Sequence, residues 1–152
     1  MRKKCLLIFK WPIDAQKFLI NKFSKFYDVE QVFISDFKNK VFSEIIDDIN
    51  LLIEEKNIKI VFFDADFNKL INFFFIKKIQ NVKKILMTFD DFALHEMNAI
   101  TANACDLVVT HCPLSVQKYR EKGYKVFFMP AEADADILKN YNLKKEIDVL
   151  FF

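Results

Sequence analysis

The chain has 152 residues, of which 53% are hydrophobic and 29% are charged, and its net charge is +2. This composition is typical of one folded globular domain and excludes disordered and collagen-like chains, while the small net charge gives no general signal for nucleic-acid binding. The single glycine excludes the glycine-rich phosphate loops of P-loop and dinucleotide-binding proteins.

The first half of the chain alternates short apolar runs with amphipathic segments. Strands are expected at residues 5–9, 29–34 and 58–63, and helices at about 14–26, 41–56 and 67–79. In the second of these helices the apolar residues recur every three or four positions, as in a helix that packs one face on a sheet. These residues are Ile45, Ile49, Leu52 and Ile53.

The second half, from Lys83 to Met129, repeats the same alternation more regularly. Apolar runs at 85–89, 107–110 and 125–129 enclose two helical segments, the second of which runs from Pro113 to Gly123. Strands and helices at this spacing are typical of parallel βαβ units. We therefore expect a Rossmann-like three-layer α/β domain with about six parallel strands in the order 3-2-1-4-5-6.

An acidic pair and a histidine follow the strand at 85–89. Asp90 and Asp91 stand where that strand meets a helix, a place where carboxylates commonly cap the helix and compensate its dipole. His95 comes four residues after Asp91, so a carboxylate could also orient the imidazole as a general base. Both interpretations stay open. We assign Asp90, Asp91 and His95 as candidate catalytic residues, with His111 beside them at the end of the next strand.

A metal site would require two histidines and two cysteines to converge, namely His95, Cys105, His111 and Cys112. Cys105 closes a helix and Cys112 follows the next strand, so their side chains need not meet. The three cysteines are odd in number and lack paired metal-ligand spacing, which predicts free thiols in a reducing cytosol. We expect no metal and no cofactor.

A second interpretation comes from the acidic end of the strand at 58–63. Asp64 there, with Thr88 at the end of the following strand, resembles the phospho-acceptor arrangement of response-regulator receiver domains. However, no acidic pair follows the first strand, and His111 stands where a receiver has a lysine, so the charge stabilisation of phosphoryl transfer is incomplete. A receiver-like signalling or binding module with Asp64 as phospho-acceptor is the alternative function.

Three motifs near the end of the chain point to a family. They read A-C-D-L-V-V-T at 104–110, Y-R-E-K-G-Y at 119–124, and F-M-P-A-E-A-D at 128–134. Their order and spacing resemble the N-terminal domain of GT-B glycosyltransferases, in particular the bacterial group near the spore-maturation-type enzymes. The apolar run at 147–152 resembles the strand that opens the second domain of that fold.

The resemblance implies an enzyme that transfers a sugar from a nucleotide-sugar to the hydroxyl of a glycan or lipid-linked acceptor. Residues 1–130 would form the acceptor-side Rossmann-like domain, and residues 131–152 the crossover helix and first strand of a donor domain that the given chain lacks. By itself the chain would then be inactive. Trp11, His111 and Glu132 are the substrate-binding residues that go with this reading.

The segment from Phe67 to Ile79 is unusually apolar for one helix. Phe67, Leu70, Ile71 and Phe74 would face the sheet, which leaves further aromatic residues to be covered by neighbouring helices or to dock on a membrane or a lipid-linked acceptor. No apolar run is long enough for a signal peptide or a membrane span. We expect a cytoplasmic protein, with peripheral contact to the inner face of the membrane as the alternative.

Overall fold

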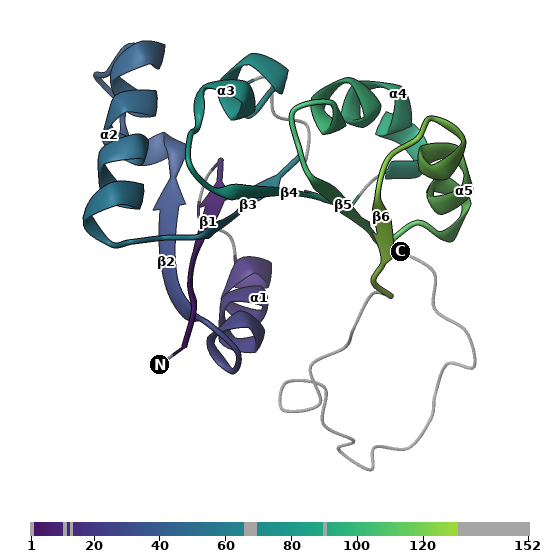
Figure 1. Cartoon of the computed structure of the whole chain (residues 1–152), viewed down its shortest axis with the longest axis horizontal. Coiled ribbons are helices and arrows are strands. Elements are labelled where there is room, and N and C mark those ends of the chain that lie inside the picture. The colour runs from purple at the N-terminus through teal and green to yellow at the C-terminus, as the bar shows by residue number, and fades with distance from the viewer. Residues whose placement is uncertain (1, 11, 13, 66–69, 90, 131–152) are drawn as a thin grey trace, which may run out of the picture.

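The computed structural model describes residues 2–10, 12, 14–65, 70–89 and 91–130. The candidate residues Trp11, Asp90 and Glu132 lie outside the described residues, as does the predicted crossover segment at 131–152. Within the described part, the chain forms a Rossmann-like α/β fold around one sheet of six parallel strands (Figure 1). The strands are β1 Lys4–Phe9, β2 Asp28–Phe33, β3 Ile60–Asp64, β4 Lys83–Thr88, β5 Leu107–Thr110 and β6 Val126–Phe128.

Helices cover both faces of the sheet, which confirms the predicted three layers. The helix α1 lies on one face, and α2, α3, α4 and α5 lie side by side on the other (Figure 1). A short 3-10 turn, η1, separates β2 from α2. The helical elements are α1 Asp14–Ser24, η1 Ile34–Asp36, α2 Phe42–Glu55, α3 Phe73–Lys78, α4 Asp91–Ala102 and α5 Pro113–Glu121.

The order of the strands differs from the predicted 3-2-1-4-5-6. The sheet runs β2-β1-β3-β4-β5-β6, so β3 pairs with both β1 and β4, and β2 forms an edge. The composition of the two strands explains the difference. β3 is buried on both faces at Val61, Phe62 and Phe63, as an interior parallel strand requires, whereas β2 carries Glu30 and Gln31, which remain partly exposed.

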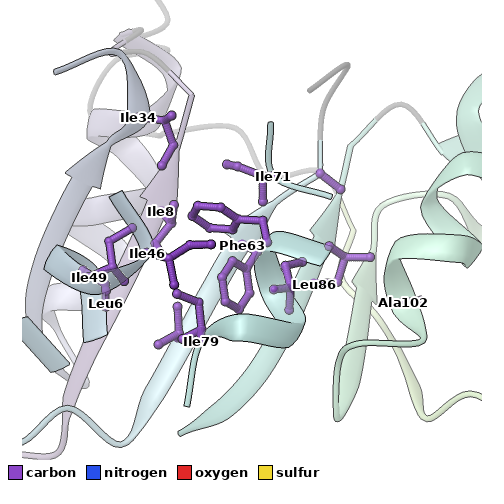
Figure 2. Packing of buried hydrophobic residues seen from close by; sticks show 14 of the residues in the cluster. Leu6, Ile8, Ile34, Ile46, Ile49, Phe63, Ile71, Ile79, Leu86 and Ala102 are labelled. Carbon is purple, nitrogen blue, oxygen red and sulfur yellow. The ribbon is translucent and has the colours of Figure 1, made fainter. Parts of the chain in front are cut away.

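The larger part of the core lies between the sheet and the four helices on its α2 side. Leu6, Ile8, Phe63 and Leu86 point to this side and pack against side chains from α2 and α3 (Figure 2). The alternate residues of the same strands face α1, where the Phe23 ring meets the Phe62 ring edge-on with centroids 4.6 Å apart. Burial on both faces fixes the register of the strands, because a shift by one residue would exchange the two faces.

The predicted helix at 67–79 is shorter than expected, and of its predicted sheet-facing residues Ile71 is buried as expected, whereas Leu70 and Phe74 are exposed. The helix α3 begins at Phe73 because the Asn72 side chain caps it, accepting a hydrogen bond from the Phe75 backbone N–H at 3.1 Å. With this start, Phe75, together with Ile76 and Ile79, is buried. Phe74 instead points outward and is 70% exposed, although it was predicted to face the sheet. Residues 66–69 lie outside the described part.

Candidate functional site

Polar and aromatic residues gather where β4 and β5 end side by side. Thr88 and Thr110 are paired in the last register position of these strands, and each strand leads directly into a helix, α4 or α5. The carboxyl edge of a parallel sheet is where ligands of this fold class bind. The side chains around this position therefore form the candidate site, and Asp91 lies at its centre.

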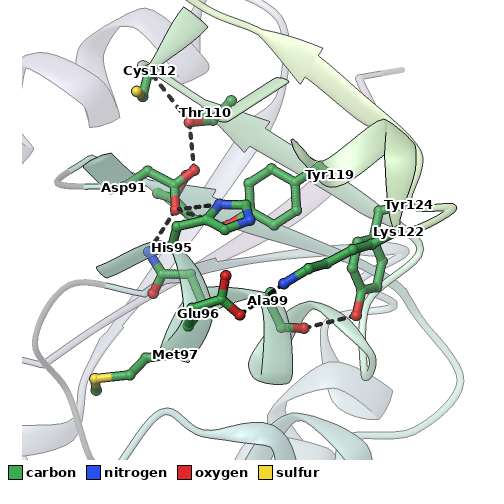
Figure 3. A network of polar contacts seen from close by, with 12 residues as sticks. Asp91, His95, Glu96, Met97, Ala99, Thr110, Cys112, Tyr119, Lys122 and Tyr124 are labelled. Carbon is green, nitrogen blue, oxygen red and sulfur yellow. Dashed lines mark hydrogen bonds and ion pairs between the residues drawn. The ribbon is translucent and has the colours of Figure 1, made fainter. Parts of the chain in front are cut away.

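The Asp91 carboxylate is fully buried and accepts three hydrogen bonds (Figure 3). The Asn98 amide donates to Oδ1 at 3.0 Å, the Tyr119 hydroxyl donates to Oδ1 at 2.9 Å, and the Thr110 hydroxyl donates to Oδ2 at 2.9 Å. Three donors around one carboxylate match its ionised, acceptor-only form. Because the donors come from α4, β5 and α5, Asp91 joins these three elements to one another.

His95 lies beside Asp91, as its spacing of four residues predicts. Its Nδ1 is 3.9 Å from Asp91 Oδ1, which is too long for a hydrogen bond, and its ring centroid is 4.6 Å from that of Tyr119. The side chain is 4% exposed, and neither ring nitrogen has a hydrogen-bond partner among the residues that the structure describes. Asp91 and His95 therefore form an interior pair, and neither reaches the surface of the carboxyl edge.

A second set of contacts holds α5 against α4 below this pair. The Tyr124 hydroxyl donates to the Ala99 carbonyl at 2.9 Å, and Lys122 Nζ lies 2.8 Å from a Glu96 carboxylate oxygen at the surface (Figure 3). Burial, and after it the nearby Asp91 charge, raises the pKa of the Tyr119 hydroxyl. Tyr119 therefore stays a neutral donor to Asp91 at all physiological pH values.

His111 is the less buried histidine of the site, although its Nε2 atom is itself buried. It follows β5, it is half-buried, and its ring stacks on the Phe89 ring with centroids 4.7 Å apart and an interplanar angle of 25°. Phe89 follows β4 and is 37% exposed. Together they form a stacked aromatic pair on two adjacent strand ends, and an outer ring face of such a pair can pack on a ring-shaped ligand.

The cysteines lie in different surroundings, and the conceivable zinc set does not assemble. Cys112 precedes α5 at the carboxyl edge, where a hydrogen bond from the Ser115 hydroxyl, followed by hydrogen bonds from backbone N–H groups, lowers the pKa of its thiol. Cys105 lies between α4 and β5, at the opposite edge, and burial raises its pKa to about 12. In the described ranges, no three His, Cys, Asp or Glu side chains come together as a metal site.

The remaining acidic candidate, Asp64, ends β3 and is half-buried. Thr88, its expected helper in a receiver-like site, is fully buried and directs its hydroxyl to the Val109 carbonyl at 3.5 Å. The described part of the chain has no helix long and apolar enough to cross a membrane.

Sequence reasoning missed three members of the Asp91 network, namely Asn98, Thr110 and Tyr119. Asn98 had a usable signal, because it follows Asp91 by seven residues and so shares its helix face. No sequence signal marked Thr110 or Tyr119 as a hydrogen-bond donor to Asp91, although both residues belong to motifs quoted above for the family resemblance. Compared with models of known protein families and with curated proteins, the chain matches none.

Proposed function

We propose that this chain is the acceptor-side part of a glycosyltransferase, which transfers a sugar from a nucleotide-sugar to the hydroxyl of an acceptor. The observation that carries the proposal is the stacked pair of Phe89 and His111 at the ends of two adjacent parallel strands. A sugar ring can pack on this aromatic pair, and in this proposal the His111 imidazole, whose Nε2 would have to become accessible, accepts the proton of the acceptor hydroxyl.

In this proposal the buried residues hold the elements of the site in place and do not contact the acceptor. Asp91 and His95 are interior, so they position α4, β5 and α5 and do not touch the acceptor themselves. His111 belongs to the same arrangement, because its backbone N–H donates to the Thr88 carbonyl at 3.2 Å and it directly follows Thr110. Asp90 remains a predicted catalytic carboxylate, and Trp11 and Glu132 remain predicted substrate contacts. The nucleotide-sugar would bind chiefly to a second domain.

The acceptor we propose is lipid-linked, because large apolar side chains project beside the candidate site. Four residues, each the first or second of its helix, form what we call the apolar rim: Phe42, Phe74, Phe92 and Leu114, exposed by 39%, 70%, 78% and 75%. Helices that follow parallel strands all begin at the carboxyl edge, so the rim runs along the edge that carries Phe89 and His111. Such a row suits the alkyl chain of a lipid-linked acceptor at the cytoplasmic membrane face.

This proposal is tested by amide NMR on the isotope-labelled chain with methyl and octyl β-glucoside, the second kept below its micelle concentration. Both ligands should shift the amides around Phe89 and His111, and UDP-glucose should leave these amides unchanged. The octyl compound should bind at least about ten-fold more tightly, because burying two or three methylenes contributes about 2 kcal/mol.

Two variants distinguish binding of the octyl chain at the apolar rim from non-specific hydrophobic binding elsewhere on the surface. Phe92→Ser/Leu114→Ser should lower the affinity for the octyl compound to that for the methyl compound. Phe127→Ser, which removes a 61% exposed ring on β6, should leave the affinity for the octyl compound unchanged. Equal affinity for the two glucosides in the wild-type chain would contradict the proposal that the acceptor is lipid-linked. If neither ligand shifts the amides around Phe89 and His111, the proposal of a sugar-binding site at these residues is contradicted.

We also keep a receiver-like module with Asp64 as phospho-acceptor, because one observation favours it. The first five strands have the order 2-1-3-4-5 of flavodoxin-like folds, which receiver domains share. A shared fold leaves the function open, and the buried Thr88 hydroxyl is directed away from such a role.

Incubation with acetyl phosphate and Mg²⁺ distinguishes the two functions. We expect no stable addition of a phosphoryl group to the chain, because the threonine is buried and His111 stands in the place of a lysine. Intact-mass measurement on the wild-type chain and on Asp64→Asn gives the answer. A phosphoryl adduct that forms on the wild-type chain and is lost in Asp64→Asn would favour the receiver-like function over sugar transfer.

A further inference from the structure

A hollow of about 680 Å³ opens at the amino edge of the sheet, opposite to the candidate site. It lies at the starts of β3 and β4, beside the turns that lead into β4 and β5. Its charged lining consists of Lys59, Lys77, Lys83, Lys84 and Asp106. Four lysines against one aspartate leave a lining charge of +3, although the whole chain carries only +2.

The one acidic side chain of the lining, Asp106, acts on Lys84, whose pKa it raises against the larger effect of burial. In the described part of the chain none of the four lysines forms an ion pair, and Lys77 instead holds its ammonium group over the Phe73 ring, 5.4 Å from the centroid. Lys77 also stands in the last turn of α3, where a cation compensates the helix dipole. Lys59, Lys83 and Lys84 belong to strand starts, so helix compensation does not account for them.

The walls of the hollow are held by side-chain hydrogen bonds to the backbone. Asn50 of α2 donates to the Lys78 carbonyl at 3.2 Å and accepts from the Gln80 N–H at 3.0 Å, which fixes the turn between α3 and β4. Asp106 accepts from the Lys84 N–H at 2.8 Å, which joins the starts of β4 and β5. The lysines therefore project from a fixed frame.

We propose that this hollow binds a small molecule that carries two or three linked phosphate groups. A lysine ammonium binds phosphate as a compact point charge, and a di- or triphosphate has about the charge needed to neutralise the lining. The volume lies within the range of about 300–1,000 Å³ that small-molecule sites occupy. The site is separate from the carboxyl edge and does not depend on the proposed sugar transfer.

Two further features restrict where such an anion can lie. A neighbouring hollow of about 560 Å³ shares Lys59 but also carries Asp47 and Glu54, whose charges repel a polyanion. Burial lowers the pKa of Lys84, so a phosphate that neutralises this partly desolvated ammonium is held more strongly than at an open surface. The ligand is therefore expected at the Lys83 and Lys84 end of the edge.

The test is titration of the chain with sodium tripolyphosphate, in low salt and EDTA, by calorimetry and amide NMR. Sulfate at equal ionic strength serves as the general-anion control. Tripolyphosphate should bind at least ten-fold more tightly than sulfate and shift the amides of Asn81, Lys83, Lys84 and Asp106. Lys59→Gln/Lys83→Gln should weaken binding about ten-fold, because half of the attractive charges are removed while the frame stays intact.

A matched double variant removes the same charge elsewhere, namely Lys38→Gln/Lys118→Gln, and it should keep wild-type affinity. Both doubles change exposed side chains, and equal thermal midpoints would verify that both are folded. Equal weakening by the two doubles, or equal affinity for sulfate and tripolyphosphate, would overturn the site. Flotation with phosphatidylglycerol vesicles separates the source of the phosphate. Binding to vesicles without binding to tripolyphosphate would assign the lysines to a membrane surface and overturn the proposal.

Discussion

Replacing Asp91 with alanine is expected to lower the free energy of unfolding by about 3–5 kcal/mol, the range observed when a buried charged interaction loses one partner. The substitution leaves Asn98, Thr110 and Tyr119 with buried donors that lack an acceptor. Each such group costs about 1–3 kcal/mol, and the three are not additive because they share one acceptor. This loss is a large share of the stability of a domain of this size.

Urea unfolding of three variants measures this prediction. Asp91→Asn should lie between wild type and Asp91→Ala, because its carbonyl still accepts from two donors and its amide can donate to the Thr110 hydroxyl oxygen. Glu96→Ala is the matched control on the same helix, since the ion pair that it removes is at the surface and screened by solvent, so its effect should be small. A loss below about 1 kcal/mol for Asp91→Ala would contradict the structural role of this carboxylate.

The same variants bear on the function of the candidate site. If Asp91 positions the elements that carry Phe89 and His111, Asp91→Asn should weaken glucoside binding only to the extent that it disorders those residues. The amide spectrum then reports both effects in one experiment. This separates a positioning role for Asp91 from direct contact with the acceptor, for which its burial leaves no room.

Local sequence signals predicted most of the elements around the site. Pro113 begins α5, and Gly123, with φ of +82°, ends the turn after it, so the two residues that mark helix boundaries in the sequence do so in the structure. The spacing of Asp91 and His95 likewise predicted that they share a helix face. These features depend on residues a few positions apart, which is why a pattern in the chain contains them.

The features that sequence reasoning missed depend on distant residues. Tyr119 lies 28 residues from Asp91 and Thr110 lies 19 residues from it, and only the pairing of β4 with β5 brings them together. Asp91 is buried because α4, β5 and α5 pack together around it. Its place at a helix start does not predict this, because a carboxylate there is usually exposed to solvent. The position of β3 beside β1 was also missed, although the polar residues of β2 already indicated an edge strand.

Stability should fall steeply in alkali, on the order of 5 kcal/mol between pH 9 and 11, which is enough to unfold many domains of this size. Burial raises the pKa of the Cys5 and Cys105 thiols from 9.0 to about 12, and burial with the Asp91 charge raises that of Tyr119 above its ordinary 10.0. Above pH 9 the unfolded chain releases these protons while the folded chain keeps them. Because the folded state then binds more protons, its stability decreases as pH rises, by up to about 1.4 kcal/mol per unit for each group.

Two other groups change the stability in the opposite direction as pH rises, and one of them supplies a control variant. The pKa values of Cys112 and Lys84 are lowered in the folded chain, so each favours folding as pH rises towards its ordinary value. In urea unfolding at pH 7.5, 9, 10 and 11, Cys105→Ala should therefore flatten the decline above pH 9, and Tyr119→Phe the decline above pH 10. Cys112→Ala, the matched thiol at the carboxyl edge, removes an opposing group and should leave that decline at least as steep as in the wild-type chain. A decline as steep as in the wild-type chain for both Cys105→Ala and Tyr119→Phe would mean that these buried groups do not govern alkaline unfolding.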